Sequence, residues 1–188
     1  MWARLSLLAG ALALGCSSSP SGRAPEAAAP LAGWTRVRSA PGGFTVELPT
    51  KPREKRAHEG PVKAHLYTSE ADDGTVYEVA YFDLPEPLEP DDRRALLETV
   101  VVGLTGGQPA RILGAREARS AGVVSLELRV SMGGEQDGIW RIFYVGDRMF
   151  QLSAVGPSDR EASRARTAFF DSFRLHGEPY RAPSASQP

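Results

Sequence analysis

The chain has 188 residues, of which 22 are Lys or Arg and 23 are Asp or Glu, so its formal net charge is −1 at pH 7. This balance argues against a nucleic-acid-binding protein, because such proteins carry a strongly basic face. The single cysteine, Cys16, excludes an intramolecular disulfide. One domain is expected once the two ends of the chain are set aside.

The chain begins with a short apolar segment that is typical of an export signal. Arg4 precedes an apolar run over residues 5–14, which is shorter than the stretch of about 18 residues that a membrane-spanning helix needs. A positive charge, a short apolar core and small residues at its end indicate a secretory signal instead. The sequence LALGC at residues 12–16 resembles the lipobox of bacterial lipoprotein precursors, although Ala13 stands where the lipobox prefers Leu. The alternative is a secreted protein with an incidental cysteine.

The resemblance to the lipobox implies where the protein is found. In that family the signal is cut just before the cysteine and a diacylglyceryl group is attached to the sulfur. Residues 1–15 are therefore expected to be a signal peptide and Cys16 the lipidation site, with the lipid anchor as the contact to the membrane. In the same family, Asp directly after the cysteine favours the inner membrane. Because Ser17 stands there, we expect a lipid-anchored protein of the bacterial cell envelope, in the outer membrane.

The two ends of the chain are predicted to stay outside the folded domain. Residues 16–32 are expected to form an acylated cysteine and a disordered tether, because the Ser, Pro and Ala of this stretch cannot bury a core. Residues 177–188 are equally poor in apolar side chains and are expected to be a disordered tail. The domain is therefore assigned to residues 33–176.

The first half of this domain is predicted to contain strands and then a helix. In GFTVELP at residues 43–49, apolar and polar side chains alternate, which is the period of a half-buried strand. Residues 62–70 and 75–84 are expected to pair as a hairpin, since EADDGT between them supplies turn residues. After a Pro-rich connection, apolar residues recur at helical spacing. This helix is expected to begin after Asp91 or Asp92 and to end at Gly106-Gly107.

The second half is predicted to contain three strands in series and a closing helix. The strands are VVSLELRVSM, GIWRIFYVG and DRMFQLSAVG, which are joined by short Gly-containing turns. In the closing segment, residues 157–175, Ser158 and Glu161 have the spacing of a capping box. The expected buried stripe of this helix consists of Ala162, Ala165, Phe169 and Phe173. Three arginines are expected to face solvent: Arg160, Arg164 and Arg166.

The order of these elements and two end motifs resemble the PsbP-like family. The motifs are GFTVELP-x-KP at residues 43–52 and FFDSFRL at residues 169–175. The family includes an extrinsic photosystem subunit, a Ran-binding import factor and many bacterial lipoproteins, some of them DcrB-like. The resemblance implies an α+β fold, an α-β-α sandwich around an antiparallel sheet, over residues 33–176. The resemblance implies no catalytic motif that could be assigned to residues of this chain, and a fold alone does not define an activity.

The residues that often perform catalysis or bind metals do not form a recognisable pattern. His58, His65 and His176 are not at metal-ligand spacing, and His65 is expected to point to solvent. Neither a nucleophile elbow nor a phosphate-binding loop occurs in the sequence. The acidic turns EADDGT and GGEQDG lack the spaced ligands of a calcium loop and fit hairpin turns better. No catalytic residue, metal site or cofactor is therefore predicted.

Two groups of residues are candidates for binding. The first is the segment KPREKRAH, expected to be a loop, which gathers Lys51, Arg53, Lys55 and Arg56. These side chains suit anionic headgroups or an acidic partner, although a solvated loop explains them as well. The second group consists of aromatic residues on the predicted strands, which either form an interface or belong to the core. They are Trp34, Tyr67, Tyr77, Tyr81, Trp140 and Tyr144.

Together these observations predict an envelope lipoprotein that acts as a non-catalytic binding or assembly accessory. Its expected partners are the membrane, through the lipid anchor, and an envelope protein; nucleic acid is not expected. Two alternatives remain open, an envelope hydrolase with a dispersed active site and a purely structural lipoprotein. A deep pocket with a nucleophile within hydrogen-bond reach of a base would favour the hydrolase.

Overall fold

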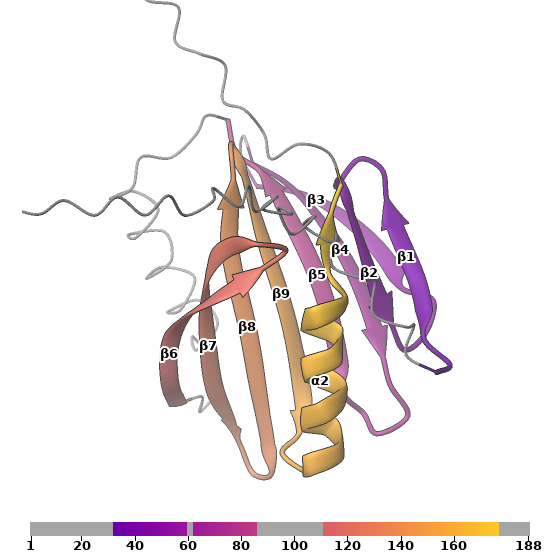
Figure 1. Ribbon diagram of the computed structural model, residues 1–188, viewed down its shortest axis with the longest axis vertical. Helices are drawn as coiled ribbons and strands as arrows, with labels where there is room; N and C mark the ends of the chain where they lie inside the picture. Colours follow the sequence, from indigo (N-terminus) through magenta and orange to yellow (C-terminus); the bar gives the residue numbers. More distant parts are fainter. Residues whose placement is uncertain (1–31, 60–61, 86–110, 177–188) are drawn as a thin grey trace, which may run out of the picture.

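The structure is a computed structural model that describes residues 32–59, 62–85 and 111–176 (Figure 1). The expected signal peptide, the expected tether except its last residue, the expected tail and the helix expected between Asp91 and Gly107 lie outside these ranges. The described elements are β1 (Thr35–Ser39), β2 (Phe44–Leu48), β3 (Arg53–Glu59), β4 (Val62–Glu70), β5 (Val76–Asp83), β6 (Arg111–Ser120), β7 (Val123–Gly133), β8 (Gln136–Val145), β9 (Arg148–Pro157), α2 (Arg160–Ser172) and β10 (Arg174–Leu175). Within the described ranges, no helix has both the length and the apolar character needed to cross a membrane.

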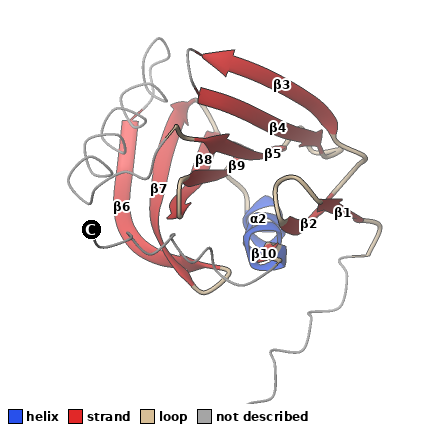
Figure 2. Ribbon diagram, turned by 90° about the horizontal axis from the view of Figure 1, so that it is seen from above, coloured by secondary structure: helices blue, strands red, loops and turns tan. Residues whose placement is uncertain are grey.

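Two antiparallel sheets pack around α2. The larger sheet has the strand order β3-β4-β5-β9-β8-β7-β6, and the smaller sheet has the order β1-β2-β10. Viewed from above, the larger sheet curves around α2, and the smaller sheet lies beside the helix on the same side (Figure 2). We call the side of the larger sheet toward α2 the helix face and the other side the outer face. The predicted hairpin, β4 and β5, and the predicted meander, β7 to β9, are both confirmed.

The main core lies between the helix face, β2 and α2. Because side chains alternate along a strand, every second residue of β9 points into it, beginning with Phe150. The predicted strand β2 is confirmed, and Phe44 and the two apolar residues that follow it at alternate positions are fully buried. It is not half-buried as expected, because Glu47 on the other side of the strand is also buried, at 5% exposed, and pairs with Arg36. Rings from distant elements meet here: Phe44 stacks on Phe173 with centroids 5.4 Å apart, and Phe143 stacks on Phe150 at 5.2 Å. This core is therefore held largely by aromatic packing.

The outer face of β7, β8 and β9 carries a second apolar cluster. Its buried members are Leu128, Val130, Trp140, Ile142 and Met149. The sheet is thus apolar on both faces, as the central layer of a sandwich must be. The described residues contain the antiparallel sheet and one helical layer, α2. The predicted second helical layer lies outside them, so the sandwich is confirmed only in these two layers.

The start of α2 differs in detail from the prediction. Asp159 rather than Ser158 caps the helix, because its carboxylate accepts a hydrogen bond of 2.8 Å from the amide of Ala162. The predicted buried stripe is confirmed at Ala162, Phe169 and Phe173, while Ala165 is only half-buried. Phe170 is also buried, which makes the apolar stripe of α2 wider than expected.

Arg166 contradicts the prediction that the arginines of α2 face solvent. It is 1% exposed because it follows Ala162 by four positions and precedes Phe169 by three, which places it within the buried stripe. Its guanidinium group pairs with the carboxylate of Asp137 and donates to the carbonyl of Pro157. The adjoining ends of β8 and β9 thus provide partners for the Arg166 guanidinium group, which was predicted to be solvated by water. Arg164 is exposed, as predicted.

The structure contains strands that the sequence analysis did not predict. The basic segment expected as a loop forms β3, an edge strand that pairs with β4 over its whole length. The strands β1 and β6 were also missed, and β6 lies at the opposite edge of the larger sheet among the described strands. An edge strand is buried on fewer sides, so it does not need the apolar alternation that reveals a central strand. Charged side chains on such a strand oppose pairing with another chain.

Candidate functional site

The basic residues predicted to bind a partner lie on and beside β3 and do not share one surface. Lys51 precedes the strand. Arg56 pairs with His65 and lies on the helix face, whereas Arg53 and Lys55 lie on the outer face. All four are exposed. Their binding role stays a prediction, and Cys16 lies outside the described residues.

The histidines do not form a metal site in the described part of the chain, where no group of three potential ligands is placed to hold an ion. His65 does not point freely to solvent as expected, because its ring stacks on that of Tyr81 with centroids 4.5 Å apart. Partial burial, with the positive charge of Arg56, lowers the pKa of His65. His176 shares a hydrogen bond with the hydroxyl of Thr45 at an exposed position.

The Thr45–His176 pair bears on the hydrolase alternative, because a hydroxyl beside an imidazole resembles a nucleophile beside a base. A catalytic pair of this kind also needs a group that orients the base and a pocket that excludes water. The contacts described for His176 include no carboxylate, and the pair lies at the surface. The described geometry therefore provides a hydroxyl group and an imidazole, but not the orienting group and the pocket that such a catalytic pair requires.

The acidic turn EADDGT forms a hairpin turn, as expected. The carboxylate of Asp73 accepts a hydrogen bond of 2.8 Å from the amide of Thr75, and Gly74 has a φ of 81°, which glycine adopts at low cost. The carboxylate of Asp73 thus stabilises the turn itself.

Most of the aromatic candidates belong to the core rather than to an interface. Tyr67, Tyr77, Tyr81 and Trp140 are buried, while Trp34 and Tyr144 are half-buried. Burial, with the negative charge of Asp73 nearby, raises the pKa of Tyr77 to about 12. The core interpretation is therefore confirmed for the four buried rings.

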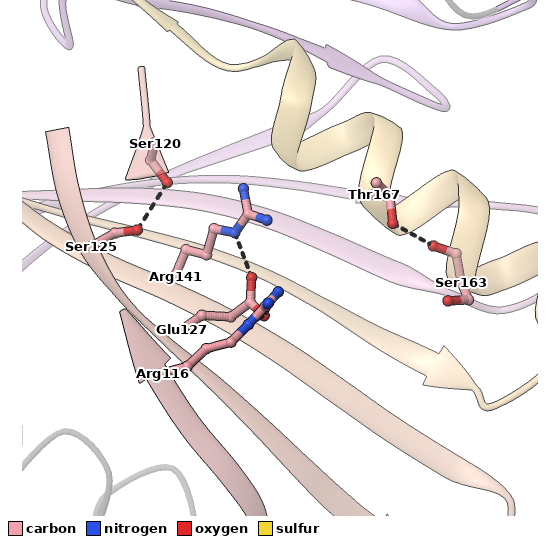
Figure 3. Close-up of polar contacts among 7 residues, drawn as sticks. All are labelled: Arg116, Ser120, Ser125, Glu127, Arg141, Ser163 and Thr167. Atoms are coloured by element: carbon pink, nitrogen blue, oxygen red, sulfur yellow. Dashed lines mark hydrogen bonds and ion pairs between the residues drawn. The ribbon is translucent and has the colours of Figure 1, made fainter. Parts of the chain in front are cut away.

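A cluster of charged side chains on the helix face is the strongest candidate for a binding site. Glu127 of β7 lies in register between Arg116 of β6 and Arg141 of β8. Figure 3 shows both guanidinium groups meeting at its carboxylate. The Nε atom of Arg116 donates to Oε1 at 2.7 Å, and the Nε atom of Arg141 donates to Oε2 at 2.8 Å. The two oxygens of one carboxylate thus each hold a different arginine.

The environment of Glu127 keeps its carboxyl group ionised. Its side chain is only 3% exposed. Burial alone would raise the pKa of Glu127, but the hydrogen bonds and positive charges of Arg116 and Arg141 outweigh it and bring the pKa below its ordinary value. The carboxylate therefore stays charged at neutral pH and fixes the positions of both arginines.

The two arginines differ in what remains available to a ligand. The guanidinium group of Arg141 lies over the ring of Phe170, 4.6 Å from its centroid, and its side chain is 13% exposed. Its Nη atoms have no hydrogen-bond partner among the described residues. Arg116 is 69% exposed. One arginine is thus rigid and recessed, and the other reaches into solvent.

A third arginine extends the cluster along β7. Arg129 follows Glu127 by two positions, so it lies on the same face, and it is exposed. Opposite it on β6 is Gly114, where an added Cβ atom would meet nothing within 4 Å. We call Arg116, Glu127, Arg129 and Arg141 the arginine cluster. Its three positive charges and one negative charge give a net charge of +2.

Two of the hydroxyl groups drawn in Figure 3 donate within the protein. The hydroxyl of Ser120 donates to that of Ser125 at 3.4 Å, near the turn between β6 and β7. On α2, the hydroxyl of Thr167 donates to the carbonyl of Ser163 at 3.0 Å. These two donors are therefore engaged, whereas the Nη atoms of Arg141 are not engaged by any described residue.

Sequence reasoning missed the arginine cluster because its members come from three strands. The signal was present as charged residues inside apolar strands, in SLELRV and in IWRIF. A charge at such a position requires a partner when it is buried. Only the register of β6, β7 and β8 reveals which residues become those partners.

Comparisons with known proteins bear on the fold. No protein-family model matches the chain, and no curated protein matches it in sequence. Cyanobacterial PsbP (CyanoP) from Synechocystis sp. PCC 6803 is similar in structure, with a TM-score of 0.54 and 16% identity over 84% of this chain and 100% of that chain.

Two further solved structures are more distant. LpqN, involved in cell envelope biogenesis of Mycobacterium tuberculosis, has a TM-score of 0.46 and 15% identity over 77% of this chain and 91% of its own. The Saccharomyces cerevisiae Ran-binding protein Mog1p has a TM-score of 0.44 and 12% identity over 76% of this chain and 95% of its own. The similarity to CyanoP carries the conclusion: this chain has a PsbP-like fold.

Proposed function

We propose that this protein is a lipid-anchored, non-catalytic binding or assembly accessory of the bacterial cell envelope. The observation that carries the proposal is the sequence LALGC at residues 12–16, which ends a short apolar segment at the chain's single cysteine. A lone exported thiol cannot form an intramolecular disulfide, whereas acylation of its sulfur gives it a function. Ser17 favours the outer membrane over the inner membrane.

The surface of the domain supports a binding role. Both faces of the larger sheet carry clusters of packed apolar side chains, while in the arginine cluster a buried carboxylate holds one exposed guanidinium group, that of Arg116, and one recessed group, that of Arg141. Arginines in such a fixed arrangement suit the recognition of a partner's anionic groups. The PsbP-like fold provides the rigid frame that holds them.

Replacement of Cys16 tests the anchor. Cells that express the wild-type chain or Cys16→Ser are labelled with radioactive palmitate and fractionated. The wild type is expected to carry label and to sediment with membranes, whereas Cys16→Ser is expected to carry none and to appear as an uncleaved precursor or as a soluble exported form. Ser18→Ala, a matched change two residues away, should behave as wild type.

The result that would refute the anchor is an unlabelled wild-type protein together with unchanged membrane retention of Cys16→Ser. A Ser17→Asp variant tests the choice of membrane, because it introduces the residue that favours the inner membrane. We expect this variant to move from the outer to the inner membrane fraction. Affinity purification from detergent-solubilised envelopes tests the accessory role, and we expect the wild-type protein to recover an envelope protein in a constant ratio.

A further inference from the structure

We propose that the arginine cluster binds carboxylate groups of an acidic segment of a partner protein. The identity of this partner as an envelope protein rests on the proposed function, but the site itself rests on the geometry of β6, β7, β8 and α2. The cluster has more positive charge than its buried carboxylate needs, its donors are held in place, and an approaching side chain can reach it.

The arginine cluster carries more positive charge than Glu127 needs. A buried carboxylate such as Glu127 requires compensation, and one arginine with good geometry neutralises it. Here Arg116 and Arg141 both contact it, and Arg129 lies two residues further along the same face. The net charge of +2 that remains has no carboxylate partner in the contacts described for these arginines. A charged ligand can therefore gain attraction at this place without displacing the internal ion pairs.

The guanidinium group of Arg141 is held in a fixed position. The Nε edge of Arg141 is bound to Glu127 and its plane lies over Phe170, so the group loses little conformational freedom when a ligand arrives. Its Nη atoms remain as donors. A guanidinium fork matches a carboxylate through two parallel hydrogen bonds, which a flexible lysine does not reproduce. Glu127 thus serves as a positioning residue for the donors.

The cluster lies on the helix face of β6, β7 and β8, where Arg141 contacts Phe170 of α2. Figure 2 shows β6 and β7 continuing the curve of the larger sheet on the side of α2 away from β3. The side chain of Arg141 is only 13% exposed, so the flat surface of a bilayer cannot lie directly against it. The carboxylate of a single side chain can approach from the exposed side, along Arg116 and Arg129, and Gly114 leaves open space opposite Arg129. This shape favours the carboxylate of a protein segment over a lipid phosphate.

Fluorescence anisotropy with a fluorescein-labelled hexaglutamate peptide tests the site. Full-length protein is purified in a non-ionic detergent and titrated at low salt. We expect saturable binding by the wild type and at least fivefold weaker binding by Arg116→Gln/Arg129→Gln. The control is Arg38→Gln/Arg164→Gln, which removes the same charge from exposed positions on β1 and α2, outside both groups of candidate binding residues, and should change the affinity less than twofold. Thermal melts of both variants check that the fold is intact.

Competition experiments distinguish a carboxylate ligand from a phosphate ligand. N-acetylglutamate amide, which carries a single side-chain carboxylate, should displace the labelled peptide at a lower concentration than glycerophosphoglycerol, a soluble phosphodiester that carries one negative charge like a lipid headgroup. The reverse order would assign the cluster to phosphate and overturn the proposal. Arg141→Lys keeps the charge but removes the fork, and it should weaken peptide binding at least threefold.

Two other outcomes would also overturn the proposal. One is the absence of saturable hexaglutamate binding to the wild type. The other is an equal loss of affinity in the cluster variant and in the Arg38→Gln/Arg164→Gln control, which would mean that general electrostatic attraction explains the binding. Neither outcome depends on lipidation of Cys16, so failure of this site is distinguishable from failure of the proposed anchor.

Discussion

Replacing Phe169 with alanine should remove a large part of the stability of the domain. The side chain is 0% exposed, and its ring lies edge-on to that of Tyr77 with centroids 5.1 Å apart and next to that of Phe170 at 5.0 Å. Truncation of a buried Phe to Ala costs about 3–5 kcal/mol, because transfer energy is lost and a cavity remains. Aromatic pairs contribute about 0.5–1.5 kcal/mol beyond burial, so we expect the upper half of the first range.

Urea melts followed by circular dichroism measure this loss. A domain typically has about 5–15 kcal/mol of stability in total, so Phe169→Ala should shift the midpoint strongly or leave the protein partly unfolded. Phe170→Ala, also buried and stacked beneath Arg141, should lose less. Arg164→Ala on the exposed side of α2 should stay within about 0.5 kcal/mol of wild type. Equal small effects at Phe169 and Arg164 would show that α2 is not docked on the sheet.

Two further predictions concern the arginine cluster and the glycines of the sheet. The pKa of Glu127 is depressed in the folded state, so its contribution to stability is present above the ordinary Glu pKa and is lost as pH falls through the depressed value. In urea melts, the difference in unfolding free energy between wild type and Glu127→Gln should therefore be largest near neutral pH and shrink in acid. A constant difference from neutral pH down to strong acid would contradict this. Gly138→Ala should destabilise the domain by about 1–3 kcal/mol, because the added Cβ would overlap the buried ring of Trp140. Gly114→Ala, where the space is open, should cost less, and equal shifts of the melting temperature would argue against the packing around Trp140.

The central strands were predictable because burial leaves a pattern in them. In β2 the apolar residues from Phe44 onward alternate with polar ones, and the meander and α2 show equally clear periods. The strands β1, β3 and β6 could not be found in this way, since backbone pairing holds an edge strand without requiring an apolar face. At Arg166, the helical period of the apolar residues indicated a buried side chain, whereas its charge indicated an exposed one. The structure shows that the side chain is buried, because Asp137 and a backbone carbonyl are available as partners.

The arginine cluster could not be predicted from local sequence patterns, for a different reason. Arg116, Glu127 and Arg141 are each unremarkable within their own strands, and their meeting depends on the register of two hairpins. A shift of one residue in either hairpin would turn the charges of one strand to the opposite face. Sequence reasoning found the charged segment around β3 because its charges are contiguous, whereas the cluster is contiguous only in space.

The pairing of β2 with β10 has a consequence for the order in which the chain acquires its structure. Thr45 and Phe44 pair with Arg174 and Leu175, and the amide of Glu47 donates to the hydroxyl of Ser172 at 3.0 Å. The core around Phe44 therefore cannot close until nearly the last residue of the domain is available. Contacts between such distant positions slow folding. When the chain emerges with its N-terminus first, from the ribosome or across a membrane, this core remains open until the C-terminal helix has followed. An open chain is the form in which a polypeptide can be threaded through a narrow channel.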